Sequence, residues 1–256
     1  MSISENLLKE ALSEFHSKKE LDCVIENSLP VLFFGDLKSY LKNDFKVVTA
    51  AINPSDMEFK KEKEQRWHST KIRFKDFDGS YESLEVACSN YFKRNTYYYQ
   101  WFGKNKKDWN KGFKPILNSM GYCYFPNKEN LKSVLHTDLC SPLATTEKWK
   151  DVSTEDKNQL IETGFPLWKR LINEIKPNLI IMSMAKEHIY RLNSKFIKSI
   201  YVKNDGYVVE FYSINIDGFK TNLIWGSAQN TPFQPFSNKS EIGELIIKCI
   251  IDEGLM

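Results

Sequence analysis

The sequence contains no apolar run of the roughly 20 residues that a membrane-spanning helix needs. It also lacks the glycine-rich patterns G-x-G-x-x-G and G-x-x-x-x-G-K-S/T, which disfavours the usual dinucleotide- and nucleotide-binding enzyme classes. Its five cysteines show no C-x-x-C spacing, and their odd number leaves at least one unpaired, as is typical of a reducing compartment. The first residues form an amphipathic pattern and not a signal peptide, so a cytoplasmic protein without membrane association is expected.

Histidine is scarce, with four in 256 residues, and the His, Cys, Asp and Glu positions show no metal-ligand spacing. No metal and no other cofactor is therefore expected. The net charge of +3 neither requires nor excludes nucleic acid as a partner. A hydrophobic fraction of 41% is enough for one substantial core without disulfides. We expect a single domain over residues 1–256.

Apolar runs of strand length alternate with segments of helical periodicity along the chain. The expected strands cover residues 46–52, 133–139, 178–182, 207–214 and 220–225, the last two joined by a hairpin at Asp217-Gly218. The expected helices cover residues 7–15, 80–92, 109–120, 154–175 and 240–251. This alternation predicts a three-layer α/β/α fold with a mostly parallel central sheet.

The run 47–52 leads directly into Asn53-Pro54-Ser55, which places an amide side chain at the end of a buried strand. Ligands of open α/β sheets gather beyond the carboxyl ends of strands. Pro54 restricts the backbone of Asn53 and so holds the amide in place. One interpretation is a catalytic residue; the other is an ordinary turn in which Asn53 bonds its own backbone.

Residues 60–109 form a basic and aromatic insertion between the first two strands. Lysine and arginine neutralise phosphates, and aromatic rings stack on unstacked bases. Any single side chain here fits a solvated surface or a core, but the cluster as a whole favours contact with nucleic acid. The candidates for contact with a DNA backbone are Ser55, Lys71, Arg73, Lys93 and Arg94.

The second strand also delivers polar side chains at its end, in the segment His136-Thr137-Asp138-Leu139-Cys140-Ser141-Pro142-Leu143. With Ile52-Asn53-Pro54-Ser55, this segment resembles the uracil-DNA glycosylase superfamily. In that family an N-P-G/S-like segment places the catalytic Asn or Asp, and a later strand ends in an Asn that reads the flipped base. The match of the second segment contains one extra residue. The resemblance spans roughly residues 30–232.

The resemblance implies a uracil-DNA glycosylase-like fold and hydrolysis of an N-glycosidic bond in DNA, with the nucleotide flipped out of the stack. Asn53 takes the part of the catalytic residue that positions water, and Asp138, Phe59 and His136 are base-binding candidates. No lysine is placed as a nucleophile, so a monofunctional enzyme that leaves an abasic site is expected. Neither a cofactor nor an obligate protein partner is implied.

The last family segment is normally a loop with a histidine that stabilises the leaving base. Here Gly226-Ser227-Ala228-Gln229-Asn230-Thr231-Pro232 has no histidine. Gln229 or Asn230 can donate a neutral hydrogen bond instead, and Thr231, Pro232 or Phe233 can wedge into the duplex. Ser227 completes this set of candidates.

Asp138 bears on the target base, because an ionised aspartate only accepts hydrogen bonds and therefore suits the N4 amino group of cytosine. Excision of normal cytosine would destroy the host's own DNA, so we expect a modified cytosine. The hydroxymethylated or glucosylated cytosine of some bacteriophages fits, which makes the chain similar to an antiphage branch of the superfamily. In the other interpretation, Asp138 is protonated by burial or bonds only the backbone.

Three alternatives stay open from the sequence. The first is a repair glycosylase that acts on uracil or another deaminated base. The second is a non-catalytic nucleic-acid-binding module with the glycosylase fold, which the missing histidine favours. The third is an α/β enzyme that processes nucleotides or sugars.

Overall fold

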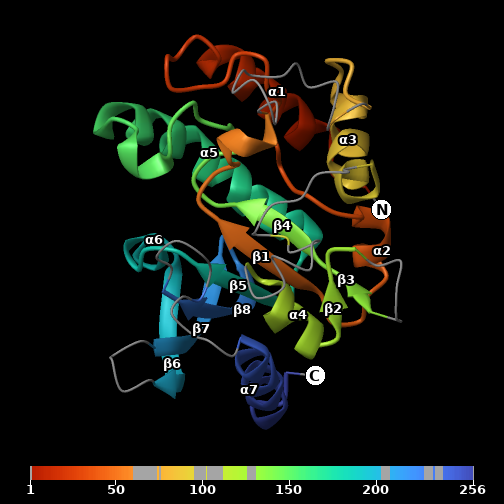
Figure 1. Cartoon of the computed structure of the whole chain (residues 1–256), viewed down its shortest axis with the longest axis vertical. Helices are drawn as coiled ribbons and strands as arrows, with labels where there is room; N and C mark the ends of the chain where they lie inside the picture. Colours follow the sequence, from red (N-terminus) through yellow and green to blue (C-terminus); the bar gives the residue numbers. More distant parts are fainter. Residues whose placement is uncertain are drawn as a thin grey trace. The chain divides into compact units, whose positions relative to one another are not determined.

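The computed structural model describes residues 2–59, 74, 76–94, 102, 112–125, 131–202, 208–227, 233 and 239–255, with only the backbone of 57, 93 and 94. The helices are α1 Glu5–Lys18, α2 Leu37–Leu41, α3 Tyr81–Arg94, α4 Lys114–Ser119, α5 Thr154–Ile175, α6 Glu187–Tyr190 and α7 Lys239–Asp252. The strands are β1 Val47–Ala51, β2 Tyr122–Cys123, β3 Lys132–Ser133, β4 Leu135–Asp138, β5 Leu179–Ser183, β6 Asn193–Val202, β7 Val208–Ile216 and β8 Phe219–Gly226. Figure 1 labels these elements.

The central sheet has six strands in the order β4-β1-β5-β8-β7-β6. β5 runs parallel to β1 and to β8, whereas β7 is antiparallel to both of its neighbours. This arrangement confirms the predicted α/β class with a mostly parallel sheet, and it is consistent with a three-layer fold. β2 and β3 form a separate two-stranded sheet.

Two compact units can be distinguished by their internal contacts. The first comprises Met1–Lys38, Ala51–Asn95 and His136–Ile175. Within it, α1 contacts both α3 and α5 (Figure 1). The indole N–H of Trp168 in α5 donates to the Thr137 hydroxyl at 3.1 Å, so α5 holds the strand that ends at Asp138.

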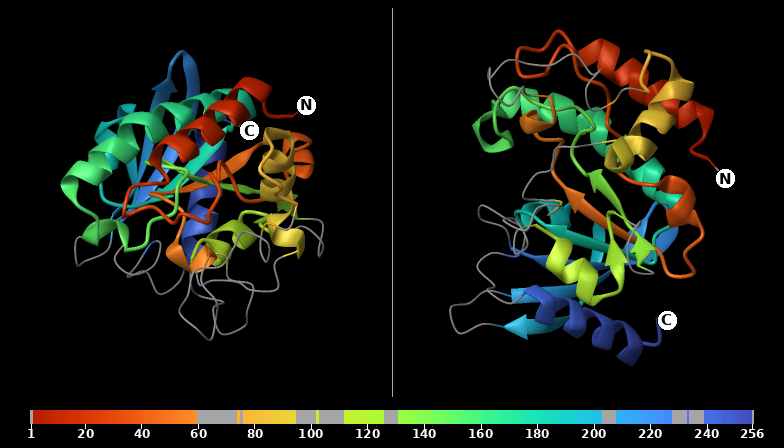
Figure 2. Two further views of the ribbon diagram at one scale, coloured as in Figure 1. Left: turned by 90° about the horizontal axis from the view of Figure 1, so that it is seen from above. Right: turned by 45° about the vertical axis from the view of Figure 1, so that its right-hand side comes forward.

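The second unit comprises Ser39–Ala50, Thr96–Leu135 and Lys176–Met256. Every residue of β5 is buried, as expected of a strand that is apolar up to its last residue, Ser183. α4 contacts α7, and α7 contacts β6 (Figure 2). The prediction of one domain over the whole chain stays a prediction.

Two predicted elements differ from those observed, and one long observed strand was not predicted. The helix expected over 109–120 begins at Lys114, because Pro115 fits only in the first turn of a helix. The strand expected over 133–139 is divided into β3 and β4. β6 was not predicted, because most of this edge strand is exposed and two register irregularities interrupt its pairing with β7.

All five cysteines are buried and free of disulfides. In the described part of the chain, every helix is too short or too polar to cross a membrane.

Candidate active site

The chain segments that follow β1 and β4 lie side by side in the first unit. The Leu139 N–H donates to the Ala51 carbonyl at 2.9 Å, and the Cys140 N–H donates to the Ile52 carbonyl at 2.8 Å. These bonds bring the segment that carries Asn53 beside the segment that carries Asp138. The structure therefore brings together the two residues that the sequence singled out.

The amide of Asn53 has a defined orientation. Its Nδ2 donates to the Thr145 hydroxyl at 3.0 Å and lies 3.5 Å from the Leu143 carbonyl. The Thr145 hydroxyl gives its own proton to the Glu147 carbonyl at 2.8 Å, so it can only accept from Asn53. Both neighbours of the amide are therefore acceptors, which assigns the NH₂ group to this side and directs Oδ1 away from it. The side chain is half-buried and is not part of a simple turn that bonds its own backbone.

Asp138 is a buried carboxyl group without a hydrogen-bond partner among the described residues. Only 4% of the residue is exposed, and neither carboxyl oxygen meets a donor. Burial, and then the negative charge of Glu58, raise the pKa of Asp138 well above its usual value. A buried polar group in this state costs roughly 1–3 kcal/mol of folding free energy, so its presence needs an explanation.

His136 lies beside Asp138 but does not form an ion pair with it. The His136 Nε2 is 3.9 Å from the Asp138 Oδ1, which is too far for a hydrogen bond. Burial lowers the pKa of His136 to about 3. Because desolvation opposes both charges and the two groups lie 3.9 Å apart, a neutral imidazole beside a protonated carboxyl group is favoured over an ion pair. This corresponds to the protonated alternative for Asp138.

Glu58 acts electrostatically on Asp138 and is hydrogen-bonded to a tyrosine in a cluster of aromatic rings. Its buried carboxylate accepts a hydrogen bond from the Tyr91 hydroxyl. The ring of Tyr91 lies 4.5 Å from that of Phe34 and 5.4 Å from that of Phe74, measured between centroids. Phe59 stacks on Phe74 at 5.7 Å and is fully buried. This cluster of buried rings, with His136 at 5.9 Å from Phe34, packs beside the Glu58 carboxylate.

The pH dependence of stability tests the assignment of Asp138. The folded protein keeps a proton that the unfolded chain releases above about pH 4, so Asp138 lowers stability as pH rises from there to its raised pKa. Over this interval, we expect the unfolding free energy of Asp138→Asn to rise relative to that of the wild type by about 1.4 kcal/mol per pH unit. Denaturant unfolding at a series of pH values measures the difference.

His136 affects the same measurements at acid pH. Burial lowers its pKa, so the stability that its neutral form contributes is lost as pH falls from about 6.5 towards 3. Both proteins are therefore expected to lose this contribution over the acid range. A stability difference between Asp138→Asn and the wild type that stays constant from pH 4 to pH 8 would contradict a buried carboxyl group with a raised pKa.

The late loop belongs to the second unit and is anchored at both ends. The Ser183 hydroxyl donates to the Ser227 carbonyl at 3.2 Å and accepts from the Phe233 N–H at 2.8 Å. Phe233 is fully buried against Gly226, where an added Cβ would lie 2.4 Å from the ring. Phe233 is therefore an anchor and is not available as a duplex wedge. The candidates Gln229, Asn230, Thr231 and Pro232 lie outside the described residues.

Of the candidates for DNA-backbone contact, only Ser55 has a described side chain. It is exposed directly after the turn at Pro54, and its hydroxyl lies 3.2 Å from the Asp56 carboxylate. The side chains of Lys71, Arg73, Lys93 and Arg94 lie outside the described residues. Among the described aromatic residues of the basic insertion, Phe74, Tyr91, Phe92 and Phe102 are buried in the core.

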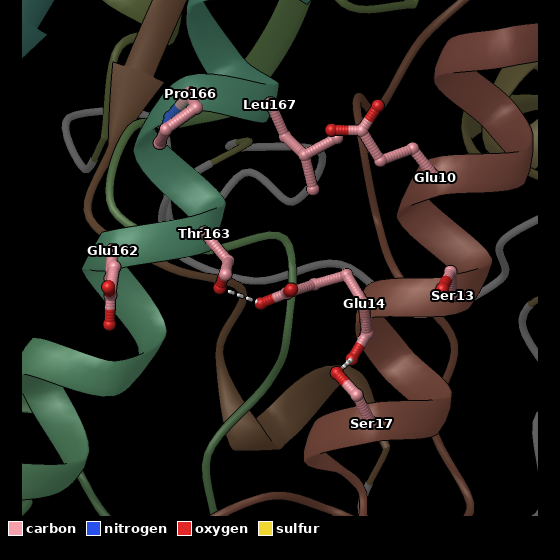
Figure 3. A pocket seen from close by; sticks show the side chains of 8 residues that line it. All are labelled: Glu10, Ser13, Glu14, Ser17, Glu162, Thr163, Pro166 and Leu167. Carbon is pink, nitrogen blue, oxygen red and sulfur yellow. Dashed lines mark hydrogen bonds between the residues drawn. The ribbon is translucent and has the colours of Figure 1, made fainter.

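An open pocket of about 340 Å³ lies elsewhere in the first unit, between α1 and α5 (Figure 3). Its walls carry Glu10, Glu14 and Glu162, and the Thr163 hydroxyl donates to the Glu14 carboxylate. Burial raises the pKa of Glu14. Three carboxyl groups repel phosphate, so this pocket does not suit nucleic acid, and neither Asn53 nor Asp138 lines it.

Two residues of the site escaped the sequence analysis. Glu58 lies between Asn53 and Phe59, and an acidic residue that directly precedes a buried aromatic was the available signal. Thr145, which orients Asn53, gave none, because a threonine in a loop is common and its contact spans 92 residues.

The described residues offer no place where three His, Cys, Asp or Glu side chains could hold a metal ion together. Comparisons with protein-family models, curated proteins and solved structures each found no match for this chain. The function of the site is therefore inferred from its own side chains.

Proposed function

We propose that this protein is a monofunctional DNA glycosylase with a uracil-DNA glycosylase-like three-layer fold. It flips out a modified cytosine-type base and excises it by hydrolysis, which leaves an abasic site. The observation that carries the proposal is the position of an oriented amide, Asn53, and a buried carboxyl group, Asp138, at neighbouring strand ends, where Asp138 meets no hydrogen-bond partner among the described residues. A flipped base is a ligand of the right kind to complete the hydrogen bonding of Asp138.

Asn53 positions the attacking water. Because Thr145 and Leu143 occupy its NH₂ group, the Oδ1 atom is left to accept a proton of water. An amide is no strong base, but a sugar that gains oxocarbenium character as the bond breaks needs only a water held in line. The fixed amide supplies this geometry without reordering at the moment of reaction.

Asp138 recognises the base edge. Its carbonyl oxygen accepts from the N4 amino group of cytosine, and its protonated oxygen donates to the ring N3. Phe59 is fully buried against Phe74, so it is not offered as the stacking surface for the base. Cytosine with a hydroxymethyl or glucosylated hydroxymethyl group, as in some phage DNA, is the preferred target, which gives the protein a part in antiphage defence.

A panel of duplexes tests the proposal. Each duplex carries one uracil, cytosine, hydroxymethylcytosine or glucosylated hydroxymethylcytosine, and alkali reveals abasic sites. We expect strand cleavage at the modified cytosines and none at normal cytosine. Cleavage at uracil alone would contradict the assignment of a cytosine-type target.

The protonation of Asp138 also favours a second candidate, a repair glycosylase for uracil. A protonated carboxyl group has the donor and acceptor pattern of an amide, which can accept from N3–H and donate to O4 of uracil. Asp138→Asn separates the two candidates. For a uracil enzyme the substitution preserves or improves uracil release, whereas for the modified-cytosine enzyme it does not create an efficient uracil activity.

A further inference from the structure

A cytosine-type base needs more stabilisation as a leaving group than uracil does. When the bond between N1 and C1′ breaks, the electron pair stays on the base. Uracil spreads this charge over two carbonyl groups, whereas cytosine has an amidine in place of one of them and is the poorer leaving group. Proton transfer to the ring during cleavage relieves this difficulty.

The site contains an acid in the position to supply that proton. Both oxygens of Asp138 are buried and meet no donor or acceptor among the described residues. The titratable groups that face it are His136 on the same strand and Glu58 on the turn Asp56–Glu58, with the Tyr91 hydroxyl of α3 behind Glu58. His136 is held neutral by its burial, and its Nε2 lies 3.9 Å from Asp138.

We propose that Asp138 is the general acid of base excision and that its carboxyl proton passes to the ring N3 of a cytosine-type base as the N1–C1′ bond breaks. This inference rests on the proposed glycosylase function. It also assigns to Asp138 the leaving-group stabilisation that the family places on a late-loop histidine, which this sequence does not have.

The step balances without a cofactor. The N1–C1′ pair of electrons leaves with the base, the Asp138 proton bonds to N3, and the base departs neutral. Water held by Asn53 adds its oxygen to C1′, and the proton that it loses restores the Asp138 carboxyl group by way of solvent. The products are a free base and an abasic site.

Glu58 is a positioning residue for this proton. Its negative charge disfavours ionisation of Asp138 and so raises the pKa of that carboxyl group, in addition to the effect of burial. The hydrogen bond from the Tyr91 hydroxyl holds the Glu58 carboxylate in place. A glutamine at position 58 can still accept this bond, so Glu58→Gln removes the charge and keeps the contact.

The pH profile of single-turnover excision from a hydroxymethylcytosine duplex tests the role of Glu58. In the wild type the rate falls as pH rises through the pKa of Asp138, because the acid is then lost. In Glu58→Gln this fall moves to lower pH. Asp56→Asn, which removes the same charge from the same turn, serves as the control and leaves the fall in place. A rate without an alkaline fall, or equal profiles for the two variants, would overturn the proposal.

Asp138→Asn tests the acid itself. It keeps the shape of the side chain and a hydrogen bond to the base but has no transferable proton. We expect excision of hydroxymethylcytosine to fall roughly 10²- to 10⁴-fold, with binding of the duplex retained in a gel-shift assay. Excision within threefold of the wild type would refute the acid role. If the wild type releases no base at all, the proposed function fails instead, so the two failures can be told apart.

Discussion

We expect replacement of Asn53 by alanine to slow the proposed base excision strongly, while the protein stays folded and binds DNA. The amide is half-buried and bonded to Thr145 and Leu143, and its free oxygen is the one group assigned to the attacking water. Loss of a fixed polar group of this kind costs roughly 10²- to 10³-fold in rate. Single-turnover kinetics on a hydroxymethylcytosine duplex, with a gel shift for binding, measure the effect.

Two further variants sharpen this result. Asn27→Ala makes the same change at an exposed asparagine of the first unit and leaves excision unchanged. Thr145→Val keeps Asn53 but removes the acceptor that orients its amide, so we expect a partial loss, because a rotating amide holds water in line for less of the time. An Asn53→Ala protein that excises as fast as the wild type would remove Asn53 from the mechanism.

Replacement of Gly164 by alanine strongly destabilises the first unit. An added Cβ would lie 2.4 Å from the Cys140 carbonyl oxygen and 2.6 Å from the Ser141 Cα, and backbone atoms cannot move aside cheaply. Overpacking of this kind costs about 1–3 kcal/mol and sometimes more. Because Cys140 follows Asp138 by two residues, the displacement also reaches the site. Denaturant unfolding and excision by the remaining folded protein measure the two effects.

Gly243→Ala is the matched control for this change. Its Cβ would lie 2.0 Å from the Ser119 hydroxyl and 2.4 Å from the Ile116 carbonyl, at a helix contact in the second unit. We expect it to lower stability as well, but to leave the excision rate of the folded protein intact. A Gly164→Ala protein as stable as the wild type would show that α5 can move away from the 140–141 segment without penalty.

Local patterns were sufficient to predict the elements that place the site. The predicted helix 154–175 coincides with α5, because a long amphipathic repeat ends just before Pro177. β1 and β4 are buried strands that neighbour each other in the sheet, and the segments that follow them lie side by side. The neighbouring positions of Asn53 and Asp138 followed from this regularity.

Features that depend on contacts distant in sequence escaped prediction. The protonation of Asp138 depends on its burial and on Glu58, which lies 80 residues earlier in the chain. The orientation of Asn53 depends on Thr145, and the exposed pattern of β6 hides an edge strand that only its pairing with β7 defines. Periodicity carries no information about such partners.

The most direct test of the central claim is mass spectrometry of the free base released from DNA that contains hydroxymethylated or glucosylated cytosine. We predict that the wild-type protein releases the modified base in equal amount to the abasic sites formed, and that Asn53→Ala and Asp138→Asn do not. DNA that the protein binds but from which no free base is released, for either modification and for uracil, would contradict the glycosylase assignment.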